Sequence, residues 1–213
     1  MTTTTPLYKA TRHEGIDFRT GTIDYAAALA SGEVIRHPAK LQRPGDSSTY
    51  LSVSVSAADC TGFQWPCRLF RVEAVGDAVP DPDIPNKRCL SALRVVEELP
   101  AWQALGPNGE AVVALIERAR TLTADEARRM DAARYAARYA AGYAAGDAAG
   151  DAAWDAARDA AWYAARDAAW YAAWYAAWDA GVALVVRDRI SPEHFETLVA
   201  PWVAGVGRTW ELA

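Results

Sequence analysis

The chain has 213 residues, with 27 acidic and 22 basic side chains and a formal net charge of −5. A DNA- or RNA-binding protein needs a basic face that displaces phosphate counterions, so this charge balance argues against a nucleic-acid partner. The N-terminal segment Met-Thr-Thr-Thr-Thr-Pro lacks the basic start and apolar core of a signal peptide, and three cysteines cannot all pair within one chain. No apolar run approaches the ~20 residues of a membrane span. We therefore expect a cytoplasmic protein without membrane contact.

The first hundred residues have the pattern of a small α+β domain. Apolar and polar side chains alternate in two segments, as they do on half-buried strands, and proline and glycine separate the segments. In chain order, the predicted elements are strand 7–10, helix 24–31 ending at Gly32, strand 50–55, strand 68–75 ending at Gly76, loop 80–86, and strand 93–99 closed by Pro100.

The remaining residues have the pattern of helices. The turn 105–109 marks the expected boundary, and apolar residues then follow at helical spacing over 111–122. Thr123-Ala-Asp-Glu126 matches a capping box, in which the threonine and glutamate side chains satisfy free backbone amides. Ser191-Pro192 is a second helix start, for a helix through about residue 200. We predict a domain 1–106, a connecting helix 107–130, a repeat helix 131–180 and a C-terminal helical cap 181–213.

Residues 131–178 are twelve tetrapeptides of the form [Asp/Tyr]-Ala-Ala-[Arg/Gly/Trp], here called the array. Alanine has the highest helix propensity, so the array is predicted to be a helix of roughly 72 Å if straight. Glycines between Gly142 and Gly150 are the expected place for a bend or a helical hairpin.

A four-residue period does not match the 3.6 residues of an α-helical turn. Each repeat is displaced by about 40°, so the alanine stripe winds around the helix and favours contacts on several sides. Closely spaced indole and phenol rings are typical of contact surfaces. We predict a homo-oligomeric assembly helix, with a protein partner as a further option; the alternatives are a spacer expanded by DNA-repeat slippage and a ligand-binding rod. The expected contact residues are Trp154, Trp162, Trp170, Trp174, Trp178, Tyr163, Tyr171 and Tyr175.

Five segments of the first domain carry a resemblance to known sequences: Leu7-Tyr8-Lys9-Ala10, Phe18-Arg19-Thr20-Gly21-Thr22, Tyr50-Leu51-Ser52-Val53-Ser54, Arg68-Leu69-Phe70-Arg71-Val72-Glu73 and Pro85-Asn86-Lys87-Arg88. They resemble a family of uncharacterised domains from actinobacterial phages and their hosts. The resemblance implies a phage-related context in a bacterial host cell and an alanine-rich tail with Asp-Ala-Ala-Trp units, and it identifies no catalytic residues.

A looser similarity relates the first domain to ADP-ribosyltransferases, which hold NAD with an arginine, a Ser-x-Ser strand and a glutamate. The matching positions are Arg12, Ser52, Ser54 and Glu73. Lys9 stands where the first strand of that family has arginine, and the usual Glu-x-Glu is absent. Ser52 and Ser54 are more simply the exposed face of a strand. Whether the protein is an enzyme stays open, with a non-enzymatic function favoured.

Basic residues of the first half could line a pocket for a small anionic ligand, as in a protein that sequesters a nucleotide signal; scattered surface charge is the alternative. They are Lys9, Arg12, Arg19, Arg36, Lys40 and Arg43. Cys60 and Cys67, with Cys89 and His37, are spaced poorly for zinc, so buried free thiols are expected rather than a metal site. No phosphate loop or dinucleotide motif occurs, and no cofactor is expected.

Overall fold

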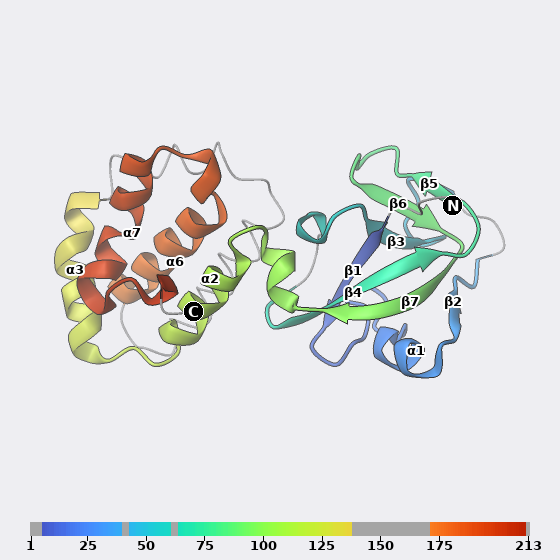
Figure 1. Cartoon of the computed structure of the whole chain (residues 1–213), viewed down its shortest axis with the longest axis horizontal. Coiled ribbons are helices and arrows are strands. Elements are labelled where there is room, and N and C mark those ends of the chain that lie inside the picture. Colours follow the sequence, from blue (N-terminus) through green and yellow to red (C-terminus); the bar gives the residue numbers. More distant parts are fainter. Residues whose placement is uncertain (1–5, 40–42, 61–63, 138–170, 212–213) are drawn as a thin grey trace. The chain divides into compact units, whose positions relative to one another are not determined.

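The structure, a computed structural model, describes residues 6–39, 43–60, 64–137 and 171–211. The chain divides into two compact units, Met1–Ala104 (unit 1) and Leu105–Ala213 (unit 2) (Figure 1). In the described part of the chain, unit 1 contains an antiparallel sheet, one α-helix and short 3-10 helices, and unit 2 is helical. The protein is therefore α+β, as predicted.

Unit 1 is built on a seven-stranded sheet in the order β2-β7-β4-β1-β3-β6-β5. Each of the four predicted strand segments contains a strand, whereas the short strands β2, β5 and β6 were not predicted. Strand β3 is as short as β6, but the alternation around it extends over residues 50–55. The strands are β1 (Leu7–Arg12), β2 (Val34–Arg36), β3 (Leu51–Ser54), β4 (Cys67–Ala74), β5 (Ala78–Pro80), β6 (Lys87–Leu90) and β7 (Ala92–Leu99).

Helix α1 (Tyr25–Ser31) follows β1 and packs on β7 (Figure 1). Its ends are those predicted: the Asp24 side chain accepts a hydrogen bond from the Ala27 N–H, and Gly32 ends it with a φ of 71°. Tyr25 enters the apolar core of unit 1 and stacks on Phe70, with ring centroids 6.2 Å apart.

Strand β1 directs one lysine toward this core. Leu7 and Lys9 pair with Val72 and Phe70 of β4, and Leu7, Phe70 and Val72 are core residues. Because successive strand residues point to opposite faces, Lys9 shares the core face with Leu7, and Arg12 lies on the other face.

Unit 2 contains helices α2 (Gly109–Ala119), α3 (Ala124–Ala137), α6 (Tyr171–Val185) and α7 (Pro192–Val206) (Figure 1). The capping box is present at α3: the Glu126 N–H donates to Thr123 Oγ1 at 3.3 Å, and the Thr123 N–H donates to Glu126 Oε2 at 2.8 Å. Ser191 caps α7, as predicted. This helix runs past residue 200 because the added turn buries Trp202 and Gly205. Short 3-10 helices cover Ala57–Asp59, Ala101–Leu105, Arg187–Arg189 and Thr209–Glu211.

Helices α3, α6 and α7 pack on one another through small residues. Ala176, Ala177 and Ala180 of α6 have no exposed surface. A Cβ atom added at Gly205 of α7 would lie 2.5 Å from Cγ of Met130 in α3. Residues 138–170 of the array lie outside the described part of the chain.

Candidate functional site

Lys9 lies at the edge of the unit 1 core and is held by three neighbours. Its Nζ is 2.6 Å from Oδ1 of Asp17, donates to the Ser52 carbonyl at 3.3 Å, and lies 5.6 Å from the centroid of the Tyr25 ring. A charge removed from water is tolerated when it is paired and hydrogen-bonded. These contacts explain how β1 carries a lysine on its apolar side.

Asp17 is the counter-ion of this lysine. Its Oδ2 accepts hydrogen bonds from the N–H of Thr20 at 2.8 Å and from the Thr20 hydroxyl at 3.0 Å. Burial by itself raises the pKa of the Asp17 carboxyl, but the Lys9 charge and the hydrogen bonds from Lys9 and Thr20 outweigh it and hold this pKa below its ordinary value. The carboxylate is therefore charged at neutral pH, and both of its oxygens are engaged within the protein.

A cavity of about 40 Å³ adjoins this ion pair, and we call it the Lys9 pocket. Its buried lining includes Asp17, Tyr25, Tyr50 and Leu51, whereas Arg19 and Thr20 are exposed. Ile23 and the polar residues Lys9, His37, Ser47 and Ser52 are half-buried and complete the lining. The cavity thus has an inner end within the core and an outer end at the β1–α1 loop.

The Tyr25 hydroxyl is an unpaired polar group in this lining. The residue is 1% exposed, yet within the described part of the chain no hydrogen bond is made by its hydroxyl. Burial, followed by the negative charge of Asp17, raises the pKa of Tyr25 far above its ordinary value, so the hydroxyl keeps its proton. By contrast, Tyr50 donates to Oδ2 of Asp81 at 2.7 Å. Within the described residues, the buried side-chain polar atoms without a partner are Nε1 of Trp65 and Nε1 of Trp210, so the unpaired Tyr25 oxygen keeps some accessible surface.

Two further groups of the lining can donate hydrogen bonds. His37 Nδ1 accepts from the Ala39 N–H at 3.1 Å, which leaves the proton of a neutral ring on Nε2. The Arg19 guanidinium makes no salt bridge within the described residues, although its charge acts on the nearby Asp46 carboxylate. Since Asp17 balances Lys9, Arg19 adds one positive side chain to the lining of the pocket.

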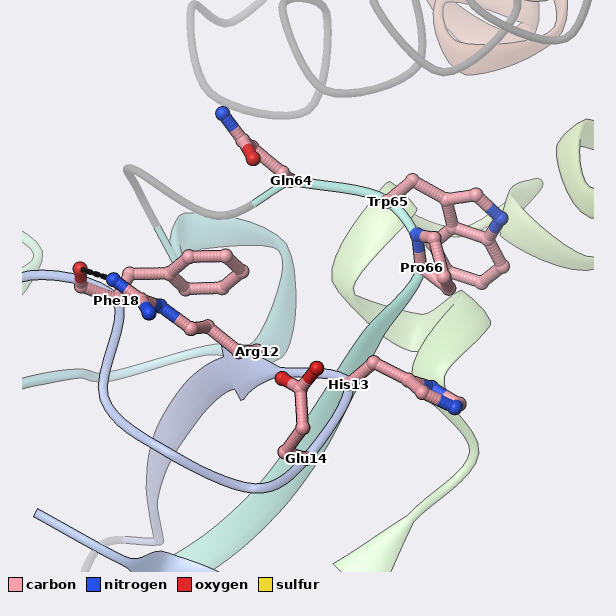
Figure 2. Close-up of a pocket in the computed structure, with 7 residues that line it drawn as sticks. All are labelled: Arg12, His13, Glu14, Phe18, Gln64, Trp65 and Pro66. Atoms are coloured by element: carbon pink, nitrogen blue, oxygen red, sulfur yellow. Dashed lines mark hydrogen bonds between the residues drawn. The ribbon is translucent and has the colours of Figure 1, made fainter. Parts of the chain in front are cut away.

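A second, larger cavity of about 500 Å³ lies on another side of the β1–α1 loop (Figure 2). Arg12 points into it beside the Phe18 ring and donates to the Phe18 carbonyl at 3.1 Å. The Glu14 carboxylate faces the same space, and Trp65 closes another side (Figure 2). Arg12 and Glu14 are exposed and carry opposite charges. The charges of these two residues therefore favour neither an anionic nor a cationic ligand in this cavity.

The basic residues proposed from the sequence do not form one site. Lys9 and Arg19 line the Lys9 pocket, and Arg12 lines the larger cavity, because Lys9 and Arg12 lie on opposite faces of β1. Arg36 and Arg43 are exposed and line neither cavity. Lys40 lies outside the described residues.

The four positions matched to ADP-ribosyltransferases are also not brought together. Arg12 pairs with Cys67 at one end of β4, and Glu73 lies six residues further along that strand, roughly 20 Å away at 3.3 Å per residue. Glu73 is 3.6 Å from Arg71, with its side chain 47% exposed. Ser52 lines the Lys9 pocket. The expectation that Ser54 is exposed was wrong: it is 2% exposed, and its hydroxyl donates to the carbonyl of Asp59 in the turn packed on β1.

Few of the aromatic residues proposed as array contacts can be placed. Trp154, Trp162, Tyr163 and Trp170 lie outside the described residues, as do the side chains of Tyr171 and Trp174. Tyr175 and Trp178 of α6 are half-buried and stacked, with ring centroids 6.4 Å apart.

The cysteines are buried free thiols, as predicted. Burial, together with the neighbouring Cys60, raises the pKa of Cys67 to about 12, so this thiol is not a ready metal ligand. Within the described ranges, no group of three or more His, Cys, Asp or Glu side chains is placed to hold a metal ion. In the same ranges, no helix is long and apolar enough to cross a membrane.

Comparison with known proteins does not assign the chain to a family. No family model matches the chain, and no curated protein or solved structure matches it. The sequence signal that could have located the Lys9 pocket is a lysine on the apolar side of a strand, eight residues before an aspartate.

Proposed function

We propose that unit 1 is a non-enzymatic domain that binds a small anionic ligand in the Lys9 pocket. The observation that carries this proposal is the Tyr25 hydroxyl, which makes no hydrogen bond within the described residues and belongs to a side chain that lines the same pocket as Lys9. A donor that faces a cavity without a protein partner can donate its hydrogen bond to a bound anion.

The charge of the pocket supports an anion rather than a cation. Asp17 is paired with Lys9 and Thr20, whereas the Arg19 guanidinium has no ion-pair partner within the described residues. A concave site whose lining has one more positive than negative side chain attracts anions.

The chemistry of the lining supports binding without turnover. Both oxygens of Asp17 accept hydrogen bonds or an ion pair from the protein, so this carboxylate is not free to accept a proton from a substrate. A domain with these properties is suited to sequestering a ligand, and a nucleotide is one ligand of the right charge.

The test compares two arginine variants of the full chain by isothermal titration with phosphate, sulfate, citrate, acetate and adenosine monophosphate. We expect at least one anion to bind, and Arg19→Gln to weaken that binding about tenfold, the usual effect of a lost charged hydrogen bond. Arg36→Gln is the matched control, since Arg36 is exposed and outside the pocket. If none of the five anions binds, or if both variants weaken binding equally, the proposed function is wrong.

For unit 2 we propose self-association through the aromatic residues of the array, in the phage-related context that the resemblance implies. The stacked pair Tyr175 and Trp178 supports this, because it shows two aromatic rings of the array in contact with each other. The packing of α3 on α6 supports the helical-hairpin form of the array. In a straight helix the ends of the array would lie roughly 70 Å apart.

The proposal of self-association is tested by measuring the molar mass of the protein in solution. Replacing Trp154, Trp162, Trp170, Trp174 and Trp178 by alanine should lower the mass measured by light scattering while the far-ultraviolet circular dichroism stays helical. The control replaces Asp147, Asp151 and Asp155 by asparagine, which changes the array without removing an aromatic ring. An unchanged mass of the tryptophan variant contradicts the proposal.

A further inference from the structure

We infer that the group held in the Lys9 pocket is a tetrahedral phosphate-type oxyanion, either inorganic phosphate or the phosphate of a monoester. This inference rests on the proposed anion-binding function and narrows it to one class of ligand. It is carried by the size of the cavity, the number of donors around it and the unpaired hydroxyl of Tyr25.

The size of the cavity limits its occupant to one small group. The volume is about 40 Å³. A single water needs about 10–15 Å³ on this measure, so the space holds about three or four heavy atoms. The phosphorus and three oxygens at the end of a phosphate ester fit this number, whereas a sugar or a base does not. The rest of an ester would lie at the outer end, beside the exposed Arg19 and Thr20.

The donors around the cavity exceed what a carboxylate can use. The Lys9 ammonium has three protons, and two of them are engaged by Asp17 and the Ser52 carbonyl. The third proton joins the hydroxyls of Tyr25 and Ser47, for which the structure gives no hydrogen bond within the described residues. The Nε2–H of His37 is a further donor. A phosphate has three strongly accepting oxygens and a charge near −2 at neutral pH, against two oxygens and one charge for a carboxylate.

The charge of Arg19 at the outer end favours a dianion. Asp17 lines the cavity and repels any anion, and its negative charge is balanced by Lys9. The second negative charge of a phosphate strengthens its attraction to Arg19, while a monoanion has half of that attraction. The donors come from separate segments of unit 1, namely β1, the start of α1 and the residues around His37 and Ser47. This distribution suits a tetrahedral group better than a planar one.

A substitution of Tyr25 distinguishes specific phosphate binding from a general electrostatic attraction of anions. Because its hydroxyl has no partner within the described protein, Tyr25→Phe removes a ligand contact without breaking an internal hydrogen bond. We expect phosphate affinity to fall about tenfold, as for a hydrogen bond to a charged acceptor, with the unfolding midpoint in urea unchanged. Tyr8→Phe is the matched control, since Tyr8 precedes Lys9 on β1 but points to the opposite face.

The experiment titrates the full chain with inorganic phosphate, glycerol phosphate, sulfate and acetate, and repeats the titrations with Tyr25→Phe and Tyr8→Phe. Phosphate or glycerol phosphate should bind at least tenfold more tightly than acetate, and only Tyr25→Phe should reduce that binding. Tighter binding of glycerol phosphate identifies a phosphate ester as the ligand, and tighter binding of phosphate identifies the free ion.

Two outcomes overturn the inference, and they are distinguishable from a failure of the proposed function. If acetate binds as tightly as phosphate and Arg19→Gln weakens both, the pocket binds anions but does not select phosphate. If phosphate binds equally to Tyr25→Phe and to the unaltered protein, the hydroxyl is not a ligand contact. If none of the anions of either experiment binds, the proposed function fails as well.

Discussion

The two units bury different kinds of side chain. In the described part of the chain, the buried polar and charged residues Thr11, Asp17, Ser54 and Asp81 all belong to unit 1. The buried residues of unit 2 are apolar or small, such as Ala176, Ala177 and Ala180 of α6. Within the described residues, unit 1 therefore combines an apolar core with internally hydrogen-bonded polar groups, whereas unit 2 buries apolar and small side chains.

The difference follows from the chemistry of each unit. A buried carboxylate must have its oxygens satisfied, so Asp17 holds Thr20 and Asp81 accepts from the backbone N–H groups of Asp83 and Ile84. These bonds shape loops, and a shaped loop can line a cavity. Alanine offers no such bonds, but its size allows helices to approach closely. For this reason the candidate ligand site lies in unit 1.

The largest predicted effect concerns the buried ion pair of unit 1. Asp17→Asn leaves the Lys9 ammonium without its counter-ion, and it should lower the free energy of unfolding by about 3 kcal/mol. Urea denaturation at pH 7 measures this loss, with Asp77→Asn, at an exposed position, as the control. Equal stability of the two variants would show that the pair does not stabilise unit 1.

The loss of stability in Asp17→Asn depends on pH, and the direction of this dependence follows from the lowered pKa of Asp17. Its pKa in the folded protein lies below the ordinary 3.8, so the ion pair contributes fully above about pH 4. This contribution is lost as the pH falls through the folded-state pKa. The difference in stability between the unaltered protein and Asp17→Asn should therefore be constant from pH 7 to about pH 5 and shrink in stronger acid.

An intermediate effect is expected where unit 2 is most tightly packed. A Cβ atom at Gly205 would lie 2.5 Å from Met130 Cγ and 3.1 Å from the Glu126 carbonyl oxygen. Gly205→Val should lower the free energy of unfolding by about 2 kcal/mol, because the backbone of α3 must shift. Ala204→Ser, at an exposed position of α7, is the control and should change it by less than about 0.5 kcal/mol. A stable Gly205→Val variant would mean that α3 and α7 are not closely packed in solution.

The smallest effect concerns a polar contact of unit 2 at a helix end. Thr123→Ala removes the hydroxyl that accepts from the Glu126 N–H and should lower the free energy of unfolding by about 1 kcal/mol. Thr123→Ser keeps the hydroxyl and should retain most of the stability. Thermal unfolding followed by circular dichroism compares the two, and an equal loss in both would rule out the capping bond as the cause.

Local signals were sufficient for much of unit 1 and for the helix ends of unit 2. Asp24, Gly32, Thr123 and Ser191 all lie at the helix boundaries predicted for them, because a cap depends on residues within one helical turn. Strand β4 was recognised from its alternation. The candidate site was only partly anticipated, since Lys9 and Arg19 stood in the proposed basic set but Asp17, Tyr25 and Ser47 did not.

Ser54 shows why the remainder could not be predicted. On its own strand it alternates like an exposed residue, but a 3-10 turn five residues later covers it. Whether one face of a strand meets water depends on segments that pack on it, and strand alternation does not contain that information.

Helix propensity and capping depend on residues close together in the sequence. The sequence alone therefore specifies where helices begin in unit 2. It also specifies that both described ends of the array are helical. The sequence alone also specifies which strand residues share a face with Lys9. Only the folded chain decides that β1 lies between β3 and β4, that Asp17 returns to Lys9, and that α3 packs on α6. These contacts join residues far apart along the chain or across a loop, where the free energy depends on burial and pairing rather than on neighbouring residues.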